Sequence, residues 1–331
     1  MAAFTAQDVK NLREKTGCGM MDCKKALTEA EGNMDRAVEL VRERGLAIAA
    51  KRSDRETSNG CVLVKKSNDF AAMIALKCET DFVANGKEFI ECTEQILDAA
   101  IAAKAKNIEE ILGLTLADGK DVATTVKLRS GITGEKMELD GYLFIEGENV
   151  EIYNHMNKNI LCTMVQTNKP AEEQGHNIAM QVAAMNPVAL NEESVTQEVK
   201  DAEYKVALEK TKEEQVEKAV TNALKKAGFN VYISESEDHM EEGIRKGEIT
   251  EAQADEIRKL KKEVAEEKLA NLNEQMIQNI AKGRMNKFFK ESCLLNQEYI
   301  QDSKLTVADY LKQTDKELTV VNFKRFSLRA D

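Results

Sequence analysis

The sequence predicts an α+β protein: a small helical head, a core of antiparallel strands and helices, and an inserted helical hairpin. Three observations lead to this fold class. Apolar residues recur with a helical period before residue 54, the period changes to that of strands at Gly60, and residues 193–289 are nearly all helical in pattern. The strands do not alternate one for one with helices, which favours antiparallel sheets over a regular βαβ arrangement.

The head, residues 1–54, reads as three short helices. Thr5 followed by Asp8 resembles a capping box, and Asn33 is a suitable cap for the third helix. The apolar face of that helix is a set at i, i+3, i+4 and i+7: Met34, Ala37, Val38 and Val41. A bundle of this size is marginal alone, so we expect a binding head joined to the core by a polar linker at 51–59.

The core is expected to begin with two strands, 61–65 and 70–78, joined at Ser67, Asn68 and Asp69 in a β-hairpin. An amphipathic helix over 89–104 follows. Further strands are expected at 136–146, 150–153, 160–166 and 318–328. Asn186 and Pro187 end another helix that begins at about residue 171.

The hairpin is expected within residues 193–289, with an interruption at 228–237. After the interruption, apolar residues step by three and four, with one slip: Ile257, Leu260, Val264, Leu269, Leu272, Met276 and Ile280. This spacing predicts an antiparallel pair of helices with a coiled-coil-like seam. Charged outer faces around such a seam suggest self-association or a second protein as partner.

The charge balance disfavours several kinds of partner, although a local basic patch is still compatible with it. The 331 residues include 47 basic and 58 acidic side chains, a formal net charge of −11. Such a chain is a poor general ligand for nucleic acid or anionic membranes, so we expect a protein partner. The first ten residues lack the apolar core of a signal peptide, and no run of 18 apolar residues occurs. Seven scattered cysteines without a CxxC predict reduced thiols in the cytoplasm.

Catalytic signatures are not found in the sequence. The three histidines are not near a GxSxG, HExxH or cysteine-containing signature, and neither a P-loop nor a GxGxxG occurs. We therefore expect no enzyme activity, no cofactor and no metal site. Two interpretations of Cys23 stay open: Lys24 and Lys25 lower its pKa, or it packs as a small apolar residue.

Residues 16–27 (TGCGMMDCKKAL) contain a candidate contact surface. Met20 and Met21 are neighbours, about 100° apart on a helix, so both cannot point inward. An exposed methionine beside Asp22 and Lys24 would give an adaptable contact. The alternative is that both methionines are partly buried core residues.

Residues 78–85 (CETDFVAN) form a second candidate site, where a strand ends before the next helix. Thr80 and Asp81 favour a turn, and Phe82 follows directly. If the turn projects, Phe82 is an exposed aromatic with a carboxylate beside it, suited to a partner's pocket. The alternative is that Phe82 folds back onto the core.

These two segments resemble the signatures of the elongation factor Ts family. The first covers residues 12–27 (LREKTGCGMMDCKKAL), with Cys18 where the family usually has Ala. The second is 78–85, with Ala75 and Lys77 in place of the usual Glu and Asn just upstream. Residues 178–187, 283–300 and 305–311 are similar to the family's core helix and C-terminal stretch, so the resemblance covers the chain in the family's order.

The resemblance implies an arrangement of five segments. Residues 1–54 would be a ubiquitin-associated-type head that docks on the GTPase domain of EF-Tu. Residues 55–140 would be the N-terminal core subdomain, and 141–192 with 283–331 the C-terminal one. Residues 193–282 would be the inserted hairpin, longer than in shorter members. The extra C-terminal helical module of some members is expected to be missing, because the last strand is followed closely by Asp331.

The function that the resemblance implies is guanine-nucleotide exchange on EF-Tu during translation elongation. The turn of Thr80, Asp81, Phe82 and Val83 would enter beside the Mg²⁺ site of EF-Tu, with Phe82 as a wedge and Asp81 acting on the metal. Docking would involve the following residues: Met20, Met21, Asp22, Lys24 and Gln181. Gln181 stands where some members have a histidine that contacts EF-Tu. Two rivals remain, namely a binding module unrelated to translation and a cysteine-dependent enzyme.

Overall fold

The computed structural model describes residues 4–329, and in them it gives the predicted α+β fold class. The chain forms two compact units. One comprises the chain up to Pro187 together with the chain from Tyr299 onward, and the other is Val188–Glu298. The five predicted segment boundaries remain predictions, although the hairpin predicted at 193–282 lies inside the second unit.

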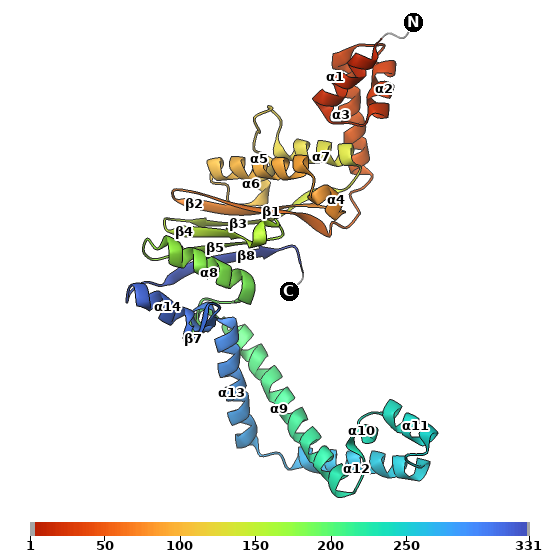
Figure 1. Cartoon of the computed structure of the whole chain (residues 1–331), viewed down its shortest axis with the longest axis vertical. Helices are drawn as coiled ribbons and strands as arrows, with labels where there is room; N and C mark the ends of the chain where they lie inside the picture. Colours follow the sequence, from red (N-terminus) through yellow and green to blue (C-terminus); the bar gives the residue numbers. More distant parts are fainter. Residues whose placement is uncertain (1–3, 330–331) are drawn as a thin grey trace. The chain divides into compact units, whose positions relative to one another are not determined.

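The head consists of α1 (Ala6–Thr16), α2 (Met20–Glu29) and α3 (Met34–Ala50), shown in Figure 1. Thr5 and Asp8 form the predicted capping box, and the Asn33 side chain accepts a hydrogen bond from the Arg36 N–H at 3.0 Å. The bundle is held by buried side chains from all three helices: Val9, Leu12, Cys23, Ala26, Leu27, Ala30, Ala37, Leu40 and Val41.

The first sheet has the order β1-β2-β3 and is antiparallel throughout: β1 is Asn59–Ser67, β2 is Phe70–Cys78 and β3 is Met137–Glu146. Ser67 pairs with Phe70, so Asn68 and Asp69 form the two-residue loop of the predicted hairpin. The second sheet has the order β4-β5-β8: Val150–Asn154, Leu161–Thr167 and Val320–Ser327.

Strand β2 is buried on both faces, because it is the central strand of a layered core (Figure 1). One face packs with α5 (Lys87–Ala103), α6 (Ile108–Leu112) and α7 (Val122–Thr133) through Phe70, Ala72, Ile74, Leu76 and Cys78. The other face packs on the second sheet through Ala71, Met73 and Ala75. Helix α8 (Glu172–Met185) contacts β4 and β5 of that sheet.

The remaining elements of this part of the chain are short. Helix α4 (Asp81–Ala84) follows β2 directly, and α14 (Val307–Thr314) follows strand β7 (Asp302–Thr306), which pairs with β6 (Glu298–Tyr299). A 3-10 turn occurs at His155–Asn157, and two more, at Glu192–Ser194 and Leu294–Asn296, belong to the second unit. None of the helices described is long and apolar enough to cross a membrane.

The second unit is helical, as predicted for the hairpin. Helix α9 (Gln197–Lys226) forms one arm of the hairpin. The other arm consists of two consecutive helices, α12 (Glu251–Ala270) and α13 (Glu274–Ser292), and both contact α9. The predicted interruption contains the one-turn helix α10 (Val231–Ser234), followed by α11 (Glu237–Lys246).

Two apolar clusters hold the second unit together. One includes Ala189, Val195, Met285, Phe289 and Cys293, and the other includes Leu224, Ile233, Met240, Ala254 and Ile257. Leu269, predicted to lie in the seam, is instead 54% exposed. Helix α12 ends one residue later, so the helical phase that places Ile257 inside is lost before α13 begins.

Candidate functional site

The 80–83 turn, defined as Thr80, Asp81, Phe82 and Val83, is the first turn of helix α4 at the end of strand β2. Thr80 is the N-cap: its extended backbone leaves the sheet, and its hydroxyl accepts a hydrogen bond from the Val83 N–H at 3.4 Å. Asp81 is the first helical residue, where a carboxylate is favoured by the exposed N–H groups of a helix start. The predicted turn is therefore a short capped helix.

Phe82 projects from this turn into solvent with 87% of its surface exposed. Val83 packs against the apolar cluster under the first sheet, and Ala84 is buried there. Neighbouring helical residues point about 100° apart, so anchoring Val83 and Ala84 directs Phe82 away from the core. The alternative interpretation, in which Phe82 folds back onto the core, is wrong for this structure.

Two glutamates hold the backbone at the start of the turn. The Thr80 N–H donates to Glu135 Oε2 at 3.1 Å, and the Thr80 hydroxyl donates to Glu135 Oε1 at 2.7 Å. The Lys136 N–H donates to Glu79 Oε1 at 2.6 Å, and Arg55 donates to Glu79 Oε2 at 2.9 Å. The Lys136 N–H holds the pKa of Glu79 below its usual value, and Arg55 acts in the same direction.

The predicted docking residues on α2 lie on its outer face. Cys23, Ala26 and Leu27 face the bundle, whereas Met20 is 46% exposed and Met21 is 65% exposed. Both methionines are thus surface residues, which contradicts the alternative that placed them in the core. Asp22 and Lys24 are also exposed. A hollow of about 480 Å³ beside Met21 is lined by Lys24, Lys25, Thr28, Glu29 and Arg44.

Gln181 differs from the other predicted docking residues. Its side chain is fully buried in α8, and its Oε1 accepts a hydrogen bond from the Ile300 N–H at 2.8 Å. A buried amide that holds a neighbouring chain segment offers no docking surface. We therefore correct the expectation for Gln181, because its position fits a structural role within this unit.

Comparison with known proteins places this chain. A family profile described as "Elongation factor TS" matches residues 79–330. An elongation factor Ts of Bacteroides fragilis is 58% identical over 330 residues, and one of Phocaeicola vulgatus is 55% identical over 329 residues. An elongation factor Ts of Porphyromonas gingivalis is 41% identical over 330 residues. Each alignment covers 99% of this chain and 100% of the relative.

The chain belongs to the elongation factor Ts family. The profile match begins at Glu79, one residue before the turn that bears Phe82, and it includes β3 of the first sheet, the whole second sheet and the helical unit. The head, β1 and β2 lie outside that match, but the full-length relatives align across them. The elongation factor Ts resemblance stated from the two motifs is thus confirmed.

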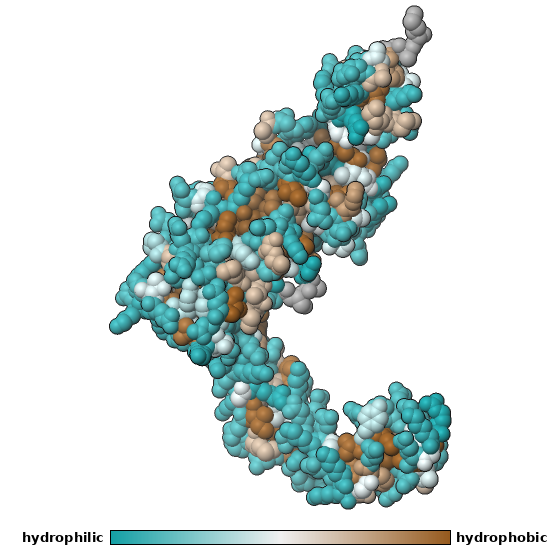
Figure 2. Space-filling model, in the orientation of Figure 1, coloured by the Kyte–Doolittle hydropathy of each residue, from teal (hydrophilic) through white to brown (hydrophobic). Residues whose placement is uncertain are grey.

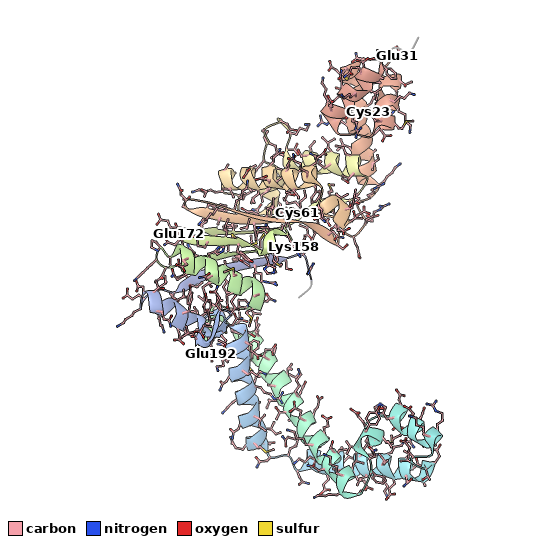
Figure 3. All side chains as sticks on the ribbon, viewed as in Figure 1. Cys23, Glu31, Cys61, Lys158, Glu172 and Glu192 are labelled. Atoms are coloured by element: carbon pink, nitrogen blue, oxygen red, sulfur yellow. The ribbon has the colours of Figure 1, made fainter. Side chains whose placement is uncertain are left out.

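The cysteines of this chain lie in surroundings that disfavour the thiolate form. All seven cysteines are free, and six of them are buried: Cys23, Cys61, Cys78, Cys92, Cys162 and Cys293. Figure 3 shows Cys23 within the head and Cys61 within the core. Burial raises the pKa of every one of the seven, to about 12 for Cys61. Cys23 therefore packs as a small apolar residue, and a cysteine-dependent enzyme gains no support.

Each histidine packs against a tyrosine ring, and the possible metal ligands are not clustered in the described part of the chain. His155 and His176 pack edge-on against the ring of Tyr153, at 5.8 and 5.6 Å between centroids. His239 stacks on Tyr232 at 4.4 Å. Within residues 4–329, no group of three or more His, Cys, Asp or Glu side chains is arranged to hold a metal ion.

Proposed function

We propose that this elongation factor Ts releases GDP from EF-Tu by inserting the 80–83 turn beside the nucleotide's Mg²⁺ site. The observation that supports this most directly is the position of Phe82, which is 87% exposed on a turn whose neighbours are fixed. An exposed aromatic on a hydrogen-bonded support is suited to fill a partner's pocket, because aromatic side chains are enriched at protein interfaces and among the residues that dominate binding energy. The family supplies the identity of the partner.

Two side chains of the turn have different tasks in this proposal. Phe82 enters a pocket between two helices of EF-Tu and displaces them. The exposed Asp81 carboxylate brings negative charge to the Mg²⁺ and its water shell. GDP then loses its charge neutralisation and dissociates, and GTP binds in its place because it is the more abundant nucleotide.

Thermodynamic linkage requires that contacts outside this turn contribute binding free energy. If the factor weakens GDP binding to EF-Tu, GDP weakens binding of the factor by the same ratio, and each tenfold costs about 1.4 kcal/mol. The rest of the interface must supply that free energy. The outer face of α2 is suited to this role, because Met20 and Met21 are exposed beside Asp22 and Lys24. Such methionines adapt to a partner surface at low cost.

The experiment that tests the function is release of fluorescent GDP. EF-Tu loaded with the labelled nucleotide is mixed with excess unlabelled GDP and substoichiometric amounts of this protein. We expect the release rate to rise with the factor's concentration and each molecule to act on many complexes. A GTPase from outside translation, loaded with the same labelled GDP, serves as the control. Unchanged release from EF-Tu over a range of factor concentrations would refute the proposal.

For the helical unit we propose a role in assembly, with a second copy of this chain as the partner. Figure 2 shows a mostly hydrophilic surface interrupted by apolar patches. A hollow of about 710 Å³ is lined by Val216, Val220, Leu224, Tyr232 and Leu269. Its rim carries both signs of charge, since Lys212 and Lys261 lie there with Glu213, Glu217 and Glu235. A rim with charges of both signs can pair with the same rim of a second copy. Sedimentation velocity measures self-association, which we expect to be weaker for Tyr232→Ser than for wild type.

We further propose that the protein acts in the cytoplasm without direct contact to nucleic acid. The net charge of −11 supports the second point, because phosphate contacts require clustered basic residues.

A further inference from the structure

The β2–β3 ladder ends just before the 80–83 turn, and side chains continue its hydrogen bonding. The last backbone pair is Cys78 with Met137. In the same register the next pairs would be 79 with 136 and 80 with 135. At these two steps carboxylates accept hydrogen bonds from the N–H groups of the opposite chain segment: Glu79 accepts from the Lys136 N–H at 2.6 Å, and Glu135 accepts from the Thr80 N–H at 3.1 Å. The two chains therefore stay joined for two residues beyond the sheet.

Glu135 does more than complete the ladder. Its second oxygen accepts from the Thr80 hydroxyl at 2.7 Å, so one carboxylate binds Thr80 at two points. A two-point, charge-assisted contact fixes orientation as well as distance. The same hydroxyl accepts from the Val83 N–H, which closes the first turn of α4. The orientation of the helix turn that bears Phe82 is thus set by Glu135 through Thr80.

Glu135 is itself held in place. It follows Gly134, whose left-handed backbone (φ 74°) ends helix α7. The Ser130 hydroxyl donates to the Glu135 carbonyl oxygen at 2.5 Å, and the Glu135 N–H donates to the Thr133 hydroxyl at 3.3 Å. These contacts anchor Glu135 to the end of core helix α7, so the turn is attached to a rigid support and not only to its own strand.

We infer that Glu135 is a positioning residue for exchange, which holds Thr80 so that Phe82 is directed toward EF-Tu before the two proteins meet. The inference rests on the proposed function and adds a residue to it. Fixing the turn in advance avoids the cost of ordering it during binding. Removing Glu135 leaves the Phe82 side chain unchanged but allows α4 to reorient about the end of β2.

The test uses the full chain with Glu135→Ala, which removes both acceptors, and Glu135→Gln, which keeps one acceptor oxygen and replaces the other with an amide nitrogen that cannot accept. Glu109→Gln is the matched control, because Glu109 is an exposed glutamate on α6 and the change in charge is identical. Deuterium uptake of the peptide over residues 79–86 and GDP release from EF-Tu are measured for each, together with melting temperature.

For Glu135→Ala we expect faster deuterium uptake in this peptide alone. We also expect a maximal GDP-release rate lower by about tenfold, as the loss of a charged hydrogen-bond pair implies. The half-saturating concentration should stay within about twofold, because the α2 face is untouched. Glu135→Gln should lie between wild type and Glu135→Ala, and Glu109→Gln should match wild type. A purely structural residue would instead change uptake throughout the core.

A second comparison covers the case in which Glu135→Ala does not fold. Thr80→Val keeps the shape of the side chain and removes the hydroxyl, so it should not add its full effect to that of Glu135→Gln. Full additivity, or wild-type uptake and wild-type release in both Glu135 variants, would overturn the inference. A wild-type protein that releases no GDP would overturn the proposed function instead, and the deuterium uptake would still decide the role of Glu135.

Discussion

Gly45 on α3 and Gly131 on α7 bring two helix backbones into direct contact. A Cβ added to Gly131 would lie 2.2 Å from the Gly45 Cα and 2.6 Å from its carbonyl carbon and oxygen. A Cβ added to Gly45 would lie 3.7 Å from the Gly131 Cα, which is an ordinary contact. This crossing joins the head to the helix that ends beside Glu135.

The asymmetry of this crossing gives the first prediction. Gly131→Ala should force α3 away from α7 and cost about 1–3 kcal/mol of unfolding free energy, as overpacking does. Gly45→Ala should be neutral or stabilising by up to about 1 kcal/mol, because alanine favours a helix and the site has room. Urea unfolding of both variants measures the difference. Equal effects of the two substitutions would show that the backbones are not in contact.

The second prediction concerns Phe82→Ala. The side chain is 87% exposed, so we expect the melting temperature of the isolated protein to stay near that of wild type. Loss of a binding anchor typically costs about 2 kcal/mol or more, and GDP release should slow by about 30-fold. Val188→Ala is the control, because it also removes an exposed apolar side chain, one that is 65% exposed. Destabilisation of Phe82→Ala with normal exchange would contradict the wedge.

The third prediction separates the metal from the wedge. Asp81→Asn removes the charge that we place beside Mg²⁺ and should slow GDP release. Its defect should shrink when release is measured in EDTA, since the metal is then already absent. Phe82→Ala should keep part of its defect in EDTA, because the Phe82 side chain is proposed to displace a part of EF-Tu and not only the metal. If EDTA leaves the Asp81→Asn defect unchanged, the carboxylate acts on something other than the metal.

Local signals in the sequence were sufficient for several elements. The Thr5 capping box, the Asn33 cap and the Asn68-Asp69 hairpin loop each depend on residues within three or four positions. Helix α7 was not predicted, and the reason is physical. Its sequence is rich in β-branched residues and its buried set is only Val122, Val126 and Ser130, so no strong apolar stripe exists. Its packing against α3 stabilises the helix, which its intrinsic helix propensity alone would not do.

The site was predictable only in part, for the same reason. The motif located Phe82, but its exposure depends on Val83 and Ala84 packing inward and on Glu135, 55 residues away. No local pattern marks that glutamate. Gln181 was misplaced although a signal existed: it lies three residues after the buried Ile178, on the apolar face of α8. A polar residue on that face is buried with a partner, which here is the Ile300 N–H.

The fourth prediction is a pH dependence centred on Glu79. The Lys136 N–H and Arg55 hold the pKa of Glu79 below the ordinary value of 4.5 in the folded protein. The folded state therefore binds this proton less well than the unfolded chain, so the stabilisation is complete above pH 4.5 and is lost as pH falls through the lowered pKa. Glu79→Gln should lower the unfolding free energy above pH 4.5 and converge with wild type as the pH falls below the lowered pKa of Glu79. A difference that stays constant with pH would contradict this linkage, and Glu109→Gln is the control.

The last prediction concerns the helical unit, which the proposal assigns to assembly and not to exchange. Its two ends lie together: the Val188 N–H donates to the Ser292 carbonyl at 2.9 Å, and the Leu294 N–H donates to that of Ala189 at 2.9 Å. The unit can therefore be shortened without separating its ends. The Glu214 and Arg284 side chains pair at 2.6 Å across α9 and α13, which marks a place to join the two helices.

We expect replacement of residues 215–283 by a short Gly/Ser linker to keep the cluster of Val195, Met285 and Phe289 and to leave the core folded. GDP release should stay within about twofold of wild type, because the contacts that free nucleotide are assigned to the turn and to α2. Self-association measured by sedimentation should be lost, because the hollow beside Tyr232 and Leu269 is removed. A folded variant with collapsed exchange would show that the helical unit contacts EF-Tu during nucleotide release.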